Sequence, residues 1–101
     1  MNSKRTGLLE FYADWCAPCL RVSPIVAELA HEFEDRIRLV RVNVDTDSAL
    51  VDKYRVYSLP TVVFLVGGRE VDRMIGAKTK GKYRAAIIKS LRKRKSISHR
   101  E

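Results

Sequence analysis

Two cysteines, Cys16 and Cys19, stand three positions apart in the stretch FYADWCAPCLRV, and the chain has no others. A close cysteine pair next to a strand–helix–strand unit is typical of a dithiol–disulfide couple. In that chemistry the first thiolate attacks a substrate disulfide. The second thiol then attacks the mixed disulfide and releases the reduced substrate. The spacing therefore predicts thiol–disulfide exchange.

The pair falls where a short apolar strand, residues 8–12, gives way to a helix that begins at Cys16. A cysteine at a helix start faces unpaired backbone N–H groups and the positive end of the helix dipole, and both favour its thiolate. Cys19, one turn inside the helix, should be more buried and keep its proton longer. Pro18 lies in the first turn, where its missing N–H costs little. We therefore expect Cys16 to be the more reactive thiol.

Two other uses of the cysteine pair fit the sequence less well. A structural disulfide would close a very short loop and gain little chain entropy, and a reducing compartment opposes it. A zinc site needs four ligands. Only His31 and His99 could complete one, and their spacing resembles no zinc pattern. We expect redox chemistry that uses no metal and no bound organic cofactor.

Hydrophobic periodicity predicts the elements that must hold the pair in place. The helix that begins at Cys16 has apolar residues at helical spacing, and Pro24 inside it should kink it. Its apolar face consists of Val22, Ile25, Val26, Leu29 and Phe33. The valine-rich segments 37–44 and 61–66 are predicted strands. Gly67 and Gly68 permit a two-residue hairpin into a strand over 69–75.

Two more helices complete the predicted elements. One opens in DTDSALVDKYRV, and the other begins near Thr79. Their apolar residues are Leu50, Val51 and Tyr54 in the first, and Tyr83, Ile87 and Leu91 in the second. The order strand, helix, strand, helix, strand, strand, helix predicts one α/β domain: a mixed four-stranded sheet with helices on both faces.

Charge is uneven along the chain. Residues 89–101 carry +5 of the net +8, so we divide the protein into a domain over 1–91 and a basic C-terminal tail over 92–101. Such a tail is typical of a frayed, solvated terminus, and its alternative role is contact with nucleic acid or an acidic partner. No apolar run approaches the roughly 18 residues that a membrane span needs, and the start makes a poor signal peptide. We expect a cytoplasmic protein with no membrane association.

Several motifs together resemble the thioredoxin family. They are FYADWCAPC, then Pro24, VNVD, and SLPTVVFLVGGREVDRMIGA, and the resemblance covers about Leu8 to Leu91. Thioredoxins usually have Trp-Cys-Gly-Pro-Cys, whereas this chain has Ala17 at the glycine. Glutaredoxins usually have Cys-Pro-Tyr-Cys and fit less well. The resemblance implies a minimal thioredoxin fold, because the chain is too short at its start for the family's usual N-terminal strand and helix.

The resemblance also implies roles for individual residues. It makes Cys16 the nucleophile, Cys19 the resolving thiol and Pro60 a cis-proline beside them. It places the substrate-binding surface on the residues around the pair, which are Trp15, Ala17, Pro18, Leu59, Gly76 and Ala77.

Glu10 is a lone carboxyl in an apolar strand. The family usually has a buried aspartate there, thought to move the proton of the second cysteine, so the resemblance makes Glu10 a catalytic residue. Arg41 falls where the family often has a lysine near that acid. The alternative is that Glu10 is a buried acid tied to Arg41 with no catalytic part.

These observations predict a protein-disulfide reductase that acts on disulfide-containing proteins. The resemblance implies that a thioredoxin reductase drawing on NADPH regenerates the dithiol. An oxidant or isomerase of the same fold is the first alternative, and redox potential would decide between them. A nucleic-acid or assembly factor that works through its tail is the second. Because the strand at 37–44 could be an exposed edge, an edge-to-edge dimer stands as the alternative to an expected monomer.

Overall fold

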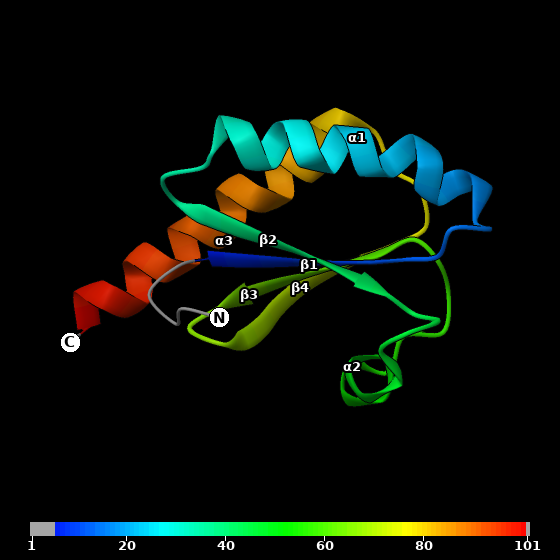
Figure 1. The fold of residues 1–101 in the computed structure, drawn as a ribbon. Coiled ribbons are helices and arrows are strands. Elements are labelled where there is room, and N and C mark those ends of the chain that lie inside the picture. Colours follow the sequence, from blue (N-terminus) through cyan, green and yellow to red (C-terminus); the bar gives the residue numbers. More distant parts are fainter. Residues whose placement is uncertain (1–5, 101) are drawn as a thin grey trace.

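The computed structural model describes residues 6–100, with side chains described for residues 6–93. It is an α/β domain built on one four-stranded sheet (Figure 1). The elements in chain order are β1 (Thr6–Tyr12), α1 (Ala17–Glu32), β2 (Ile37–Asn43), α2 (Ser48–Tyr54), β3 (Thr61–Val66), β4 (Arg69–Ile75) and α3 (Lys80–Arg100). The predicted element order and fold class are therefore confirmed.

The sheet has the strand order β2-β1-β3-β4 and is mixed. β1 pairs in parallel with β2 and antiparallel with β3, and β3 pairs antiparallel with β4. The hairpin between β3 and β4 turns at Gly67 and Gly68, whose φ angles of 59° and 80° suit glycine. β2 is an edge strand, as predicted. β1 and β3 are the two central strands. The cysteines follow β1 and Pro60 precedes β3.

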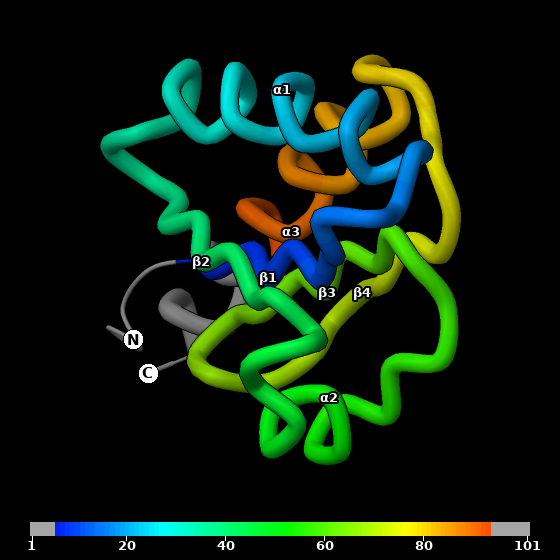
Figure 2. The backbone as a smooth tube through the Cα atoms, turned by 45° about the vertical axis from the view of Figure 1, so that its right-hand side comes forward, coloured from blue at the N-terminus to red at the C-terminus, as the bar shows by residue number. Residues whose placement is uncertain are grey.

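Helices cover both faces of the sheet (Figure 2). α1 and α3 lie together on one face, and α2 lies on the other. Because both faces are covered, every residue of β3 is buried, and so are Thr6 to Phe11 of β1. The larger core, against α1 and α3, consists of Leu8, Val22, Val26, Leu29, Phe33, Ile37, Val62, Phe64, Tyr83, Ala86 and Ile87. The smaller, on the α2 side, consists of Leu9, Phe11, Val42, Val56, Val63 and Leu65.

Alternation along β1 decides which way its residues point. Leu8 belongs to the core on the α1 face, and Leu9 and Phe11 belong to the core on the α2 face. Successive side chains of a strand point to opposite faces. Glu10 therefore points to the same face as Leu8, toward α1.

α3 extends beyond the boundary that we placed at residue 91. Its backbone is helical as far as Arg100, because the sequence after Leu91 contains no glycine or proline that would end a helix. Lys93 reaches back to β4 and donates to the carbonyl oxygen of Val71 at 3.3 Å. The basic segment therefore continues α3 in its backbone, and its separation from the domain as a tail stays a prediction. The side chains from 94 onward, including His99, and residue 101 lie outside the described residues.

Among the helices that the structure describes, none combines the length and the apolar character that crossing a bilayer requires.

Candidate active site

The two cysteines lie at the junction between β1 and α1. Cys16 is the N-cap of α1, and its Sγ accepts a hydrogen bond from the backbone N–H of Cys19 at 3.3 Å. The backbone N–H of Cys16 donates to the carbonyl of Ala13 at 3.2 Å, which closes the turn after the strand. Pro18 falls in the first turn of the helix, as predicted. A helix that starts in this way satisfies one of its unpaired N–H groups with sulfur.

The two thiols differ in their surroundings. Cys16 keeps 5% of its surface exposed and Cys19 keeps 1%. Burial raises the pKa of the Cys19 thiol to about 11, and the hydrogen bond to Cys16 adds to the rise. Cys19 therefore keeps its proton at neutral pH, in agreement with the expectation from its place inside the helix.

Leu59 lies beside the cysteines, and Pro60 follows it in the chain. The Leu59–Pro60 peptide bond is cis, as the resemblance implied. Leu59 packs against the small cluster formed by Ala13, Cys16 and Cys19. The carbonyl oxygen of Pro60 accepts a hydrogen bond from the backbone N–H of Gly76 at 2.8 Å. That bond ties the end of β4 to the start of β3, so the segment at Gly76 and Ala77 borders the same end of the sheet.

Trp15 is held above the surface by a partner that sequence reasoning missed. Its side chain is 71% exposed, and its indole N–H donates to Oδ2 of Asp45 at 2.9 Å. Asp45 follows β2, in the motif VNVD. Its backbone N–H bonds to the Asn43 side chain at 2.9 Å. Ala17 and Ala77 are exposed and Pro18 is half-buried, so these three are open to a docking chain.

Glu10 is completely buried and lies within a small polar network. The register of β1 and β2 sets Glu10 opposite Arg41, whose Nε lies 3.4 Å from Oε1 of the carboxyl. Ser23 of α1 donates a short hydrogen bond to Oε2, and Nη2 of Arg41 donates to Ser23 Oγ at 3.2 Å. Arg41 also stacks over the Tyr12 ring, 4.0 Å from its centroid. The predicted Glu10–Arg41 pair is therefore present.

Ser23 is the second residue that sequence reasoning missed. It lies four positions after Cys19, so the two side chains share one face of α1. Both line a cavity of about 430 Å³ between α1 and the β1–β2 side of the sheet. The cavity is lined by Tyr12, Ala13, Asp14, Cys19, Leu20, Ser23, Pro24, Ala27 and Arg41. The spacing from Cys19 is a signal that could have found Ser23.

The described residues contain no group of three or more side chains suited to holding a metal ion. His31, one of the two histidines considered for zinc, is exposed and lies 3.5 Å from the carboxylate of Glu34.

Comparisons with known proteins agree with this geometry. The sequence model of the thioredoxin family matches residues 1–89. A thioredoxin of Pyropia yezoensis is 36% identical over 89 residues, which cover 88% of this chain and 83% of the relative. A bifunctional thioredoxin reductase/thioredoxin of Mycobacterium leprae is 34% identical over 91 residues, which cover 90% of this chain and 19% of the relative.

A solved structure, that of Fasciola hepatica thioredoxin, superimposes with a TM-score of 0.80 at 37% identity and covers 86% of this chain and 82% of its own. The motif, the fold and these relatives agree. The chain belongs to the thioredoxin family and is a thiol–disulfide oxidoreductase, a protein-disulfide reductase with two cysteines at the start of α1.

Proposed function

We propose that this protein reduces protein disulfides with Cys16 as the attacking thiol and Cys19 as the resolving thiol. The observation that carries the assignment is the asymmetry of the pair. Cys16 caps α1, and its sulfur accepts the Cys19 N–H bond. Cys19 is buried and its pKa is raised to about 11. Cys16 is the more exposed sulfur and Cys19 keeps its proton at neutral pH, so we assign the first attack to Cys16.

In the first step the Cys16 thiolate attacks one sulfur of a substrate disulfide. A bond forms between Cys16 and the substrate, the substrate disulfide breaks, and the departing thiolate takes a proton from water. In the second step Cys19 loses its proton and attacks Cys16 Sγ. The intramolecular disulfide forms, and the second substrate thiolate leaves and is protonated. The substrate gains two electrons and the protein loses two.

Glu10 is the proposed acceptor of the Cys19 proton. Its carboxyl is buried, and Ser23 and Arg41 from its own network line the cavity that Cys19 also lines. Among residues 6–93 no group hydrogen-bonds to Oε1, whose ion-pair partner is Nε of Arg41 at 3.4 Å. The transfer would pass through a water in the cavity and the hydroxyl of Ser23, which lines the cavity and bonds to Glu10.

The substrate chain would dock on the exposed rim around Cys16. Trp15, Ala17, Pro18 and Ala77 supply its surface, while Leu59, Pro60 and Gly76 border it at the same end of the sheet. Pro60 acts here as a positioning residue beside the thiols.

Electrons would return through a thioredoxin reductase. The Mycobacterium leprae relative, whose name joins that reductase to a thioredoxin, supports this partner. The dithiol requires a reducing compartment, and we place it in the cytoplasm, where it would serve electron transfer and redox homeostasis. We expect a monomer, because the β2 edge carries the exposed cations Arg38 and Arg41, which oppose pairing with a second copy.

Reduction of a disulfide substrate by wild type, Cys16→Ser and Cys19→Ser tests the assignment. We expect Cys16→Ser to be inactive and Cys19→Ser to accumulate a mixed disulfide, detectable by mass spectrometry. Brief iodoacetamide treatment near neutral pH should label Cys16 before Cys19. Equal labelling of the two cysteines would contradict the assignment. A mixed disulfide trapped on Cys19 would show that Cys19 is the attacking thiol. A redox potential near the −180 mV of isomerases rather than the −270 mV of thioredoxin would favour an isomerase or oxidant.

A further inference from the structure

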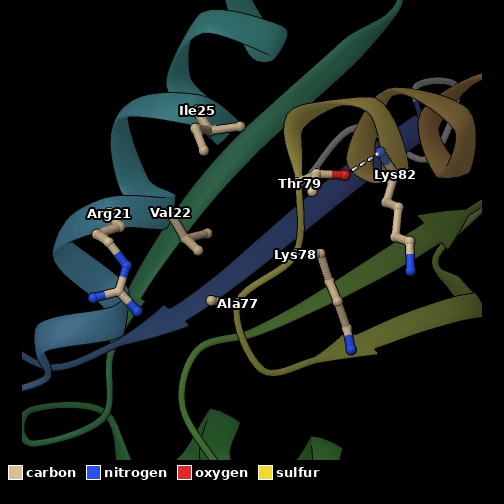
Figure 3. A pocket seen from close by; sticks show the side chains of 7 residues that line it. All are labelled: Arg21, Val22, Ile25, Ala77, Lys78, Thr79 and Lys82. Atoms are coloured by element: carbon tan, nitrogen blue, oxygen red, sulfur yellow. Dashed lines mark hydrogen bonds between the residues drawn. The ribbon is translucent and has the colours of Figure 1, made fainter.

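A second cavity, of about 490 Å³, opens on the other side of α1 (Figure 3). Val22 and Ile25 of α1 and Ala77 of the segment before α3 make it partly apolar. Three cations also line it: Arg21 from α1, Lys78 from the segment before α3, and Lys82 from the first turn of α3.

These three cations are unpaired within the described residues. Two other cations of α3 do face carboxylates of α1: Lys80 Nζ lies 2.7 Å from Glu28 and Arg84 Nη2 lies 2.7 Å from Glu32. No such ion pair is made by Arg21, Lys78 or Lys82 among residues 6–93.

The backbone adds to the positive charge of this cavity. The first turn of α3 contains no acidic residue, so the positive end of its dipole is not neutralised locally. Cations from three segments line one cavity, so its surface is positively charged and complements an external anion. The cavity thus has the charge and the volume to accept an acidic group.

The cavity borders the proposed docking rim. Ala77 lines it and also belongs to the rim, next to Gly76, whose N–H bonds to Pro60. Arg21 lies one turn after Ala17, a rise of about 6 Å along the helix. A polypeptide held at Cys16 would therefore place its neighbouring residues over this cavity.

We propose that this cationic cavity binds an acidic side chain of the substrate polypeptide beside the disulfide, and so makes the protein prefer acidic disulfide substrates. The inference rests on the proposed function. The mixed lining suits a glutamate or aspartate, whose methylene groups pack on Val22, Ile25 and Ala77 while its carboxylate meets the cations. The lining includes no aromatic ring on which a nucleic-acid base could stack. A protein substrate is therefore favoured over nucleic acid.

Three disulfide-bridged peptides that differ only in the residues flanking one cysteine test the idea: glutamate, glutamine or lysine. Each is mixed with prereduced protein at low salt, and the second-order rate of peptide reduction is measured. We expect wild type to reduce the glutamate peptide roughly fivefold to tenfold faster than the glutamine peptide, on the scale of a few exposed ion pairs, and the lysine peptide more slowly. Added salt should diminish the difference.

The variant Arg21→Gln/Lys78→Gln/Lys82→Gln should lose this preference. The matched control, Arg38→Gln/Arg69→Gln/Lys89→Gln, removes the same charge from exposed positions; Arg38 and Arg69 lie at the opposite end of the sheet. It should keep the preference. Far-UV circular dichroism checks that both fold.

If both triple variants lose the preference equally, net charge alone steers the peptides, and the proposal that the cavity binds them is wrong. The proposal is also wrong if the wild-type protein reduces all three peptides at the same rate. Stronger inhibition by a short oligonucleotide than by a linear acidic peptide would overturn the choice of occupant. If wild type reduces none of the peptides, the glutamine one included, the proposed function itself fails.

Discussion

The two sides of α1 hold similar charged groups in opposite environments. On the β2 side Glu10 is fully buried and is held by Ser23 and Arg41. On the α3 side, Glu28 and Glu32 form ion pairs with Lys80 and Arg84, with carboxylate side chains 65% and 45% exposed. The exposed pairs have the shorter N···O distances, 2.7 Å against 3.4 Å for Glu10.

Pair distance alone would rank the exposed pairs as the more important. Burial reverses the ranking, because water screens an exposed pair and leaves it little net energy. A buried carboxyl has no water to replace a lost partner, so each group around it matters. The comparison teaches that position relative to solvent, more than pair distance, decides how strongly a carboxylate depends on its partners.

The largest expected effect is that of Glu10→Gln on catalysis. The change removes the proposed proton acceptor and keeps the shape of the side chain. We expect the step in which Cys19 resolves the mixed disulfide to slow by roughly tenfold or more, the scale of general acid–base effects. Stopped-flow reduction of a disulfide substrate measures it. Glu28→Gln, the same chemical change on the exposed side, is the control and should leave the rate unaltered.

Urea melts of the Glu10→Gln protein separate catalysis from structure. Arg41 is 46% exposed and can be solvated when its partner becomes neutral, so we expect stability to hold or rise. A large loss of stability together with an unchanged rate would make Glu10 a structural partner only.

Ser23→Ala should destabilise the protein by about 1–2 kcal/mol, since it removes a donor from a buried carboxyl. Ser23→Thr keeps the hydroxyl and should restore most of that loss. Urea unfolding at neutral pH measures both. If Ser23→Ala and Ser23→Thr have the same stability, the hydroxyl does not stabilise Glu10. The buried carboxyl would then depend on its partners no more than the exposed carboxylates do.

Alkaline pH should weaken the reduced protein through Cys19. Its pKa in the folded state, about 11, lies above the ordinary thiol value of 9.0. The neutral thiol's contribution is therefore fully present below pH 9 and is lost as pH rises from about 9 to 11. By pH 10 the loss should be about 1 kcal/mol. Burial also raises the pKa of the Tyr83 phenol. Comparing urea melts of wild type and Cys19→Ala across this pH range separates the effect of Cys19 from that of Tyr83.

The smallest expected effect belongs to the exposed pairs. Glu28→Gln and Glu32→Gln should each leave the urea midpoint at pH 7 within experimental scatter. The hydrogen bond from Lys80 holds the pKa of Glu28 below its ordinary value of 4.5, and Arg84 does the same for Glu32. What stability these pairs contribute is therefore present above pH 4.5 and lost as pH falls below it. If either variant lost as much stability as Ser23→Ala, the exposed pairs would matter as much as the buried network, contrary to our expectation.

Much of the fold followed from local pattern. The strand at 61–66, the hairpin at Gly67 and Gly68 and the strand at 69–75 were predicted with their observed bounds. The helix after Cys16 and the edge position of the strand near 37–44 were also confirmed. The extension of α3 to Arg100 was missed, because the charge run after Leu91 was interpreted as a tail although nothing in it ends a helix.

The sequence by itself indicated the chemistry, because two cysteines three positions apart at a predicted strand–helix junction are typical of thiol–disulfide exchange. It also placed a lone carboxyl, Glu10, in an apolar strand. Only the tertiary structure decided that Ser23 binds Glu10, that Asp45 holds Trp15, and that Arg21 lies with Lys78 and Lys82. Periodicity describes one element at a time, whereas these groupings bring together residues 13 to 61 positions apart, and they depend on how α1 packs against the sheet and α3.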